Sequence, residues 1–432
     1  MNPPPILEAA PRLPGHEAPE VSHLRRVRAR GPFRGRIALL GPAFVAAVAY
    51  IDPGNFATNI AGGAGYGYLL VWVIVAANLM AMLVQYLSAK TGIATGRNLP
   101  ELCRERFPRP VTWGLWAQAE AIAIATDLAE FVGAAIALNL LFGVPPFAAG
   151  LITAVVAFAI LALQTRGYRR FELAIAGFLG IVCLGFLYDL SFTGVDAGEF
   201  AAGLIPGFDG TDSILLAVGI LGATVMPHVV YLHSALTSQR IPTDNPAEKR
   251  ELLRFQRVDV LAAMGIAGFI NMTMLVVAAE LFHDTAYTGV DTIEGAHAGI
   301  ETLIGGGAAL AFAVALLASG LSSSSVGTFA GQIVMQGFID RRIDLFLRRA
   351  ITMAPALVVL ALGLDPSSTL VISQVVLSFG IPFALVPMIL LTRRADVMGA
   401  LVNRRGTTVL ASIVAAMIIS LNVFLLYETF FG

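Results

Sequence analysis

The chain has 432 residues, of which 57% are hydrophobic and only 13% are charged, and its mean hydropathy is +0.77. Soluble domains carry roughly 25% charged residues, so this composition excludes a soluble multidomain enzyme and, outside local segments, a disordered protein. The net charge of −1 gives no reason to expect a nucleic acid as partner. Two cysteines, Cys103 and Cys183, argue against a disulfide framework. The remaining class is an all-α membrane protein that crosses the bilayer many times.

Residues 1–36 are rich in proline and arginine and contain no apolar run, so we expect a disordered cytoplasmic tail there. A membrane span needs about 20 mostly apolar residues. Eleven stretches of the sequence meet this requirement. They are residues 37–60, 67–89, 113–142, 146–164, 171–189, 213–238, 256–282, 303–338, 346–364, 368–392 and 407–430.

The charged residues alternate from one connection between spans to the next. All 28 basic residues lie in the tail or in every second connection, whereas the other connections carry acids such as Asp196 and Glu199 after the fifth span. Basic residues are retained on the cytoplasmic side of membrane proteins. The pattern therefore predicts eleven spans, with the N-terminus in the cytoplasm and the C-terminus outside.

Two of the predicted spans contain a proline near mid-membrane, flanked by polar or metal-binding side chains. These are Pro53 in the first span and Pro227 in the sixth. A proline removes a backbone donor, and the freed carbonyl survives in a membrane only where it is buried or lines a cavity. A single proline is also compatible with a simple kink. Two breaks five spans apart predict two inverted five-span repeats with a transport site between them.

The residues around the two breaks form a mixed set of metal ligands. Asp52 is an ionisable side chain deep in the membrane, Asn55 lies one helical turn later, and Met226 offers a thioether. The freed carbonyls near Ala49 and Ala223 add oxygens. Oxygen ligands alone suit Mg²⁺ and Ca²⁺, whereas a thioether favours softer metals, so we expect Mn²⁺, Fe²⁺ or Co²⁺, with Cd²⁺ as a toxic guest. The alternative for Met226 is packing.

Gln374 precedes a further stretch that favours a break, Ser378–Pro382, in the tenth span. We expect Gln374 to contact the substrate in one transport state. The alternative is a hydrogen bond between helices.

Three carboxylates of the third span, Glu120, Asp127 and Glu130, fall within an arc of about 80° on a helix. Such a stripe is typical of a proton relay. His228 and His233 in the sixth span are candidate members, and Arg240, Arg348 and Arg349 are candidate counter-ions. Each group also has a structural explanation. Glu120 lies near the cytoplasmic interface, the arginines mark orientation, and both histidines suit a packed core.

Three motifs resemble signatures of the Nramp family (natural resistance-associated macrophage protein). They are Asp52-Pro53-Gly54-Asn55, Met226-Pro227-His228 and residues 320–338. The resemblance covers nearly the whole chain and implies a bacterial proton-coupled manganese transporter of the cytoplasmic (inner) membrane. It also implies a LeuT-type fold with a 5+5 inverted repeat and one extra helix.

By motif match, the resemblance implies that the metal ligands are Asp52, Asn55, Met226 and the carbonyls of Ala49 and Ala223. The acids of the family's third span match Asp127 and Glu130, and its sixth-span histidines match His228 and His233. We expect divalent metal ions and protons as substrates, no cofactor, and a monomer in the lipid bilayer.

The expected organisation is a tail over 1–36, a first repeat over 37–189, a second over 190–393 that includes a long outer loop, 190–212, and the eleventh helix over 394–432. Two other functions compete with metal import. A Na⁺-coupled amino-acid carrier of this architecture conflicts with Asp52, which would repel a substrate carboxylate. A membrane metalloenzyme would need a shared zinc site, but His228 and His233 lie about 140° apart on a helix.

Overall fold

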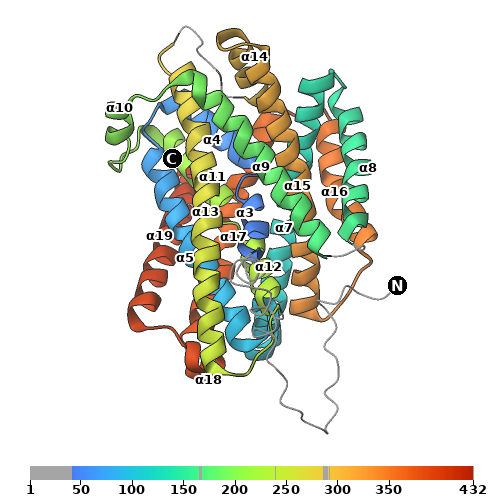
Figure 1. The fold of residues 1–432 in the computed structure, drawn as a ribbon, viewed down its shortest axis with the longest axis vertical. Coiled ribbons are helices and arrows are strands. Elements are labelled where there is room, and N and C mark those ends of the chain that lie inside the picture. Colours follow the sequence, from blue (N-terminus) through green and yellow to red (C-terminus); the bar gives the residue numbers. More distant parts are fainter. Residues whose placement is uncertain (1–40, 165–167, 239, 286–289, 291, 432) are drawn as a thin grey trace, which may run out of the picture.

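The computed structural model describes residues 41–431 except 165–167, 239, 286–289 and 291, and it describes side chains outside 161–172, 345, 428 and 429. Over these residues, every regular element is a helix (Figure 1). The predicted tail and residues 37–40 of the first predicted span lie outside the described residues.

Eight helical segments of the described chain are long and apolar enough to cross a membrane. They coincide with predicted spans 2, 3, 5, 6, 7, 8, 10 and 11. They are α5 (Val71–Thr95), α7 (Arg109–Phe142), α9 (Tyr168–Thr193), α11 (Gly210–Thr224) together with α12 (Pro227–Ser238), α13 (Pro246–Phe282), α15 (Gly306–Ile339), α17 (Pro366–Thr392) and α19 (Arg405–Phe431).

The other three predicted spans are also helical but shorter or interrupted. The first is divided into α3 (Pro42–Ala49) and α4 (Pro53–Tyr66), of 8 and 14 residues, and α16 (Leu345–Ala361) has 17 residues. The fourth is α8 (Pro146–Gln164). The helical class with many spans is therefore confirmed, whereas the count of eleven crossings stays a prediction.

Four short helices and a 3₁₀ turn lie between the long ones. α10 (Ala197–Ala202) and α14 (Ile293–Leu303) lie at one end of the molecule, and α18 (Ala395–Met398) lies at the opposite end (Figure 1). The turn η1 (Gly399–Leu401) follows α18, and α6 (Leu99–Arg106) connects α5 to α7. The acidic connections contain α10 and α14, whereas the connection with the arginines after α17 contains α18. The two ends of the molecule therefore differ in charge, as the sequence predicts.

The interrupted helices form the centre of the bundle. All of α3 except Phe44 is buried, α4 packs against α13, α11 against α17, and α12 against α5. α8 and α16 contact each other at one edge, and α19 lies at the opposite edge (Figure 1). These edge helices expose large apolar side chains, including Val155, Ile351 and Val409, which suit contact with lipid.

α17 continues as a helix through Pro382, so the break that the sequence favours at Ser378–Pro382 does not form. α19 supplies the hydrogen bond that this proline removes. Pro382 has no N–H to donate to the carbonyl of Ser378 one turn earlier. Instead, the Asn422 amide of α19 donates to that carbonyl over 3.0 Å and accepts a bond from the Ser378 hydroxyl over 2.6 Å. Both residues are buried. α19 is thereby attached to α17 one turn before Pro382.

We expect Asn422→Leu to destabilise the protein by about 1–3 kcal/mol, because the buried Ser378 carbonyl would lose its donor. The measurement is the melting temperature of the purified protein in detergent, with the neighbouring Val423→Ala on an exposed face as control. An unchanged melting temperature for Asn422→Leu would show that the carbonyl finds another donor.

Candidate functional site

The first break lies between α3 and α4. The residue four positions after Ala49 is Pro53, so the Ala49 carbonyl has no helical donor. Two neighbouring carbonyls receive side-chain donors instead: Asn271 donates to Tyr50 over 2.9 Å and Ser319 to Ile51 over 2.5 Å. Hydrogen bonds from α13 and α15 therefore stabilise the unwound segment, and the Ala49 carbonyl remains available to bind a ligand.

The second break, between α11 and α12, repeats this arrangement. The residue four positions after Ala223 is Pro227, so this carbonyl also lacks a helical donor. The Asn55 amide donates to it over 3.1 Å and to the Asp52 carboxylate over 2.8 Å. Asp52 caps the N-terminus of α4 by accepting from the Asn55 N–H over 2.8 Å. Asn55 thus joins the two breaks.

Several polar atoms at this junction are buried without a hydrogen-bond partner. They include Oδ2 of Asp52, Oδ1 of Asn55 and Oε1 of Gln374. Asp52, Asn55 and Met226 are all 0% exposed. Such atoms carry a large desolvation cost unless something polar or charged pairs with them. Converging unpaired oxygens next to a buried carboxylate suit a cation.

Gln374 lies between the two breaks. A Cβ atom on Gly54 would overlap the Gln374 side chain, and one on Gly222 would overlap the Gln374 backbone carbonyl. A Cβ on Gly133 of α7 would likewise overlap Pro53. These glycines permit the close approach of α17 and α7 to the breaks, so Gln374 lies at the junction, and its contact with the substrate stays a prediction.

The acids of α7 pair with two consecutive arginines of α16. Glu120 accepts two bonds from Arg348, the shorter of 2.6 Å, and Asp127 lies 3.3 Å from Arg349. Arg349 is 1% exposed and also donates to the Ser324 carbonyl over 2.8 Å and to the Thr328 hydroxyl over 2.6 Å. Two of the three predicted counter-ions, Arg348 and Arg349, therefore contact the carboxylate stripe.

Glu130 is buried without a hydrogen-bond partner for either carboxylate oxygen. A Cβ on Gly327 of α15 would lie 2.8 Å from Glu130 Oε2 and 3.1 Å from Asp127 Oδ1. The backbone of α15 therefore packs directly against both acids. His228 reaches the same helix through Thr126, whose hydroxyl lies 3.3 Å from His228 Nδ1. The Nε2 atom of His228 has no partner.

His233 belongs to a different network. Its Nδ1 lies 2.8 Å from Gln85 Oε1, and its Nε2 lies 3.3 Å from Gln256 Nε2. Gln85 donates to the Tyr50 hydroxyl beside the first break, and Gln256 donates to Asp259 over 2.7 Å. The sequence therefore correctly placed His233 in the buried interior, but its ring nitrogens bond to Gln85 of α5 and Gln256 of α13 rather than to the acids of α7.

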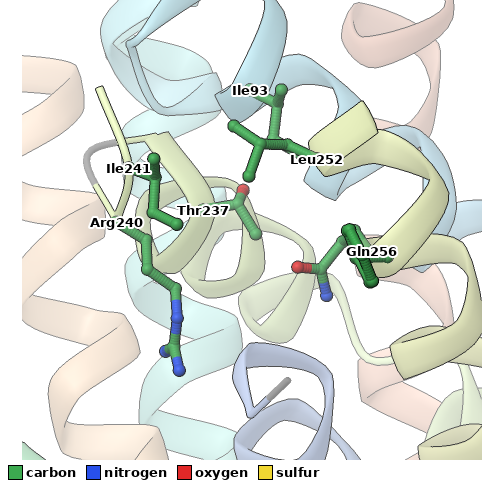
Figure 2. A pocket seen from close by; sticks show the side chains of 7 residues that line it. Ile93, Thr237, Arg240, Ile241, Leu252 and Gln256 are labelled. Carbon is green, nitrogen blue, oxygen red and sulfur yellow. The ribbon is translucent and has the colours of Figure 1, made fainter. Parts of the chain in front are cut away.

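Arg240 lies with this second network. It interacts electrostatically with Asp259, and Figure 2 shows Arg240 and Gln256 lining one small pocket of about 20 Å³. That volume is enough for about one water molecule. The acid that Arg240 interacts with is thus Asp259 of α13, and not one of the acids on α7 with which the sequence analysis grouped it.

Asp259 is a buried residue that the sequence analysis overlooked. Its carboxylate accepts from the Gly41 N–H over 3.0 Å and from the Ala43 N–H over 2.9 Å, which caps α3. The signal was present, because an acid inside a predicted span is a functional candidate by default. Thr126 and Ser319 carried no comparable signal, since isolated hydroxyls are common in membrane helices.

No cluster of three or more His, Cys, Asp or Glu side chains in the described residues could hold a metal ion. The junction instead combines a carboxylate, an amide, a thioether and main-chain carbonyls. The family model for natural resistance-associated macrophage protein-like sequences matches residues 43–428. The chain belongs to the Nramp family.

Individual Nramp relatives are similar over most of their length. The divalent metal cation transporter MntH of Deinococcus radiodurans is 57% identical over 396 residues, which is 92% of this chain and 91% of the relative. The MntH protein of Bacillus subtilis is 53% identical over 399 residues, or 92% and 94% of the two chains. These relatives are named as transporters, in agreement with the expectation that the chain is not an enzyme.

Solved structures show the same architecture. A crystal structure of the Eremococcus coleocola manganese transporter with an aromatic bis-isothiourea compound matches with a TM-score of 0.82 and 33% identity, over 91% of this chain and 86% of that one. The nucleobase-cation-symport-1 family transporter Mhp1 matches with a TM-score of 0.58 and 15% identity, over 89% and 91%. This second likeness concerns the fold alone, and the expected LeuT-type fold of the Nramp chain is confirmed.

Proposed function

We propose that this chain imports divalent transition metals, Mn²⁺ first among them and also Fe²⁺, Co²⁺ and Cd²⁺, together with protons. The observation that carries the proposal is the Asn55 amide, which bonds both Asp52 and the Ala223 carbonyl and so joins the two breaks. The names of the relatives support the choice of substrate and count against an amino-acid carrier or a metalloenzyme.

The metal ligands are Asp52, Asn55, Met226 and the carbonyls of Ala49 and Ala223. Asp52 supplies the charge that offsets the loss of the ion's water, and its unpaired Oδ2 is available without breaking a hydrogen bond. The thioether adds affinity for transition metals but nothing for Mg²⁺ or Ca²⁺. Gln374 is an additional ligand in one state, since its Oε1 is unpaired and its side chain packs against Gly54.

The proton route begins at Asp52, where the incoming cation favours the ionised carboxylate and so releases a proton. Glu130, Asp127 and Glu120 carry it along α7 toward the cytoplasm, with His228 beside the entry. Arg349 and Arg348 pair with Asp127 and Glu120 along this route. His233 and Arg240, hydrogen-bonded or charge-coupled to α13, act on the inner end of α3 through Asp259 rather than on this route.

The chain lies in the bacterial inner membrane as a monomer, with its N-terminus in the cytoplasm and its C-terminus outside. Residues 37–189 and 190–393 form the two inverted repeats, and 394–432 form the extra helix. Support comes from the matching proline breaks in α3–α4 and α11–α12 and from the charge difference between the two ends. Transport then moves the broken helices against the surrounding bundle.

A proton gradient should accelerate Mn²⁺ uptake by the wild-type protein. In proteoliposomes that contain a metal-sensitive dye, a gradient of about one pH unit, acid outside, is worth about 1.4 kcal/mol per proton, up to roughly tenfold in rate. Glu130→Gln should still transport Mn²⁺ but respond less to the gradient, because the amide cannot pass the proton on.

Glu199→Gln is the matched control, since Glu199 is an exposed acid on α10. Its gradient response should equal that of the wild type. Uptake by the wild type that ignores the gradient would remove proton coupling from the proposal while leaving metal transport standing.

A further inference from the structure

A large cavity opens between α5, α13 and the start of α19. Figure 1 labels α18 at this end of the molecule. Its volume is about 840 Å³. Its lining contains five basic and no acidic side chains. The basic residues are Lys90, Arg250, Arg254, Arg257 and Arg404.

These cations have no acidic partner among the described residues. Lys90 is 5% exposed, and its ammonium donates to the Asn403 amide oxygen over 2.6 Å, while no ion pair is formed by any of the five. Arg257 and Arg404 add electrostatic repulsion to Lys90. A buried cation among like charges is costly without an anion. Lys90 is the buried cation, and the four arginines around it are exposed, so the cavity favours a negatively charged occupant.

Tyr86 orders two of the cations. The Lys90 ammonium lies 5.9 Å and the Arg257 guanidinium 5.3 Å from the centre of its ring. Arg257 also donates to the Tyr86 hydroxyl over 3.4 Å. Cation–π contacts of this kind hold a guanidinium in place without neutralising its charge. The remaining donors of Arg257 stay available for an oxyanion.

The wall of the cavity is apolar on the side of the membrane. Met82, Leu83, Leu261 and Leu410 line it, and Leu261 and Leu410 are each 52% exposed. A soluble anion would leave these side chains uncovered, whereas acyl chains would cover them. A group of basic side chains next to exposed apolar side chains is suited to a phospholipid, whose phosphate is attached to acyl chains.

We propose that this cavity binds the phosphate headgroup of an anionic phospholipid from the cytoplasmic leaflet. Arg254, Arg257 and Arg404 contact the phosphate oxygens, the buried Lys90 supplies charge from below, and the acyl chains lie over Leu261 and Leu410. The lipid bridges α5, α13 and α19, so it attaches the eleventh helix to the bundle at this end. A free phosphate ion has the same headgroup chemistry but lacks the chains.

The test compares lipid retention by the full chain and two triple variants. Arg254→Gln/Arg257→Gln/Arg404→Gln removes three charges from the cavity. Arg341→Gln/Arg342→Gln/Arg393→Gln removes three exposed charges from the same end of the molecule, outside the cavity. Each protein is equilibrated with phosphatidylglycerol or phosphatidylcholine in detergent, and bound lipid is counted by native mass spectrometry.

The wild type should retain phosphatidylglycerol in preference to phosphatidylcholine. The cavity variant should bind phosphatidylglycerol on the order of tenfold more weakly, and the control should change by less than about twofold, since surface charges act mainly at long range. Equal losses in the two variants would overturn the site. A melting temperature in lipid-free detergent confirms that the cavity variant is folded.

A second arm adds inorganic phosphate at millimolar concentration. The proposal expects phosphatidylglycerol to remain bound, because phosphate cannot replace the contacts of the acyl chains. Displacement of the lipid by phosphate, with no preference over phosphatidylcholine, would overturn the lipid as occupant and assign the cavity to a soluble anion. Neither arm depends on metal transport, so the outcome is separate from that of the proposed function.

Discussion

Asp52→Asn should abolish Mn²⁺ uptake in proteoliposomes. The substitution keeps the size of the side chain and its N-cap at α4, but it removes the negative charge at the junction of the breaks. A dehydrated cation without its buried counter-charge loses about 3–5 kcal/mol, which corresponds to more than a hundredfold in affinity. The measurement is initial uptake over a range of Mn²⁺ concentrations, together with Mn²⁺ binding to the purified protein by calorimetry.

The control for Asp52 is Asp209→Asn, which neutralises an exposed acid that makes no side-chain cap at α11. Its uptake should remain close to that of the wild type. If Asp52→Asn bound Mn²⁺ as tightly as the wild type, the metal site would have to lie away from the two breaks.

Met226→Ala should reduce the preference for Mn²⁺ over Mg²⁺ and Ca²⁺. We expect the ratio of Mn²⁺ uptake without and with excess Mg²⁺ or Ca²⁺ to rise by roughly tenfold, equivalent to about 1.4 kcal/mol of relative binding. The oxygen ligands remain, so uptake itself should continue. The thioether alone distinguishes this ligand set from one that suits Mg²⁺ and Ca²⁺.

Two variants separate ligation from packing. Met226→Leu keeps the volume of the side chain but removes the sulfur, so it should lose discrimination as Met226→Ala does. Met264→Ala creates a cavity at another methionine that is 0% exposed, in α13, and should discriminate as the wild type does. If Met226→Leu discriminated normally, the sulfur would serve packing, and selectivity would come from Asp52, Asn55 and the carbonyls.

Local rules explain why the breaks could be predicted in detail. Proline affects the carbonyl four residues earlier, so Pro53 and Pro227 point directly to Ala49 and Ala223. The apolar runs and the alternation of basic connections likewise depend on neighbours in the chain. Those rules identified the class of protein and the helical segments, whereas the count of eleven crossings stays a prediction.

Ion pairs between residues far apart in the chain were harder to predict from the sequence. The sequence proposed Arg348 and Arg349 as counter-ions, and they pair with Glu120 and Asp127. It grouped Arg240 with the same acids, yet Arg240 interacts with Asp259. All three arginines lie near the same side of the predicted membrane, so charge and depth cannot distinguish their partners. Only the packing of α12 and α16 against different neighbours does so.

The sequence by itself determined that this is a membrane protein of many helices with two matched breaks. Only the tertiary structure decided that Asn55 meets the Ala223 carbonyl, 168 residues away, and that Asp259 caps α3 from 216 residues away. Periodicity, proline chemistry and charge placement act over a few residues. A hydrogen bond between distant helices depends on how every intervening helix packs, and no short segment of sequence carries that information.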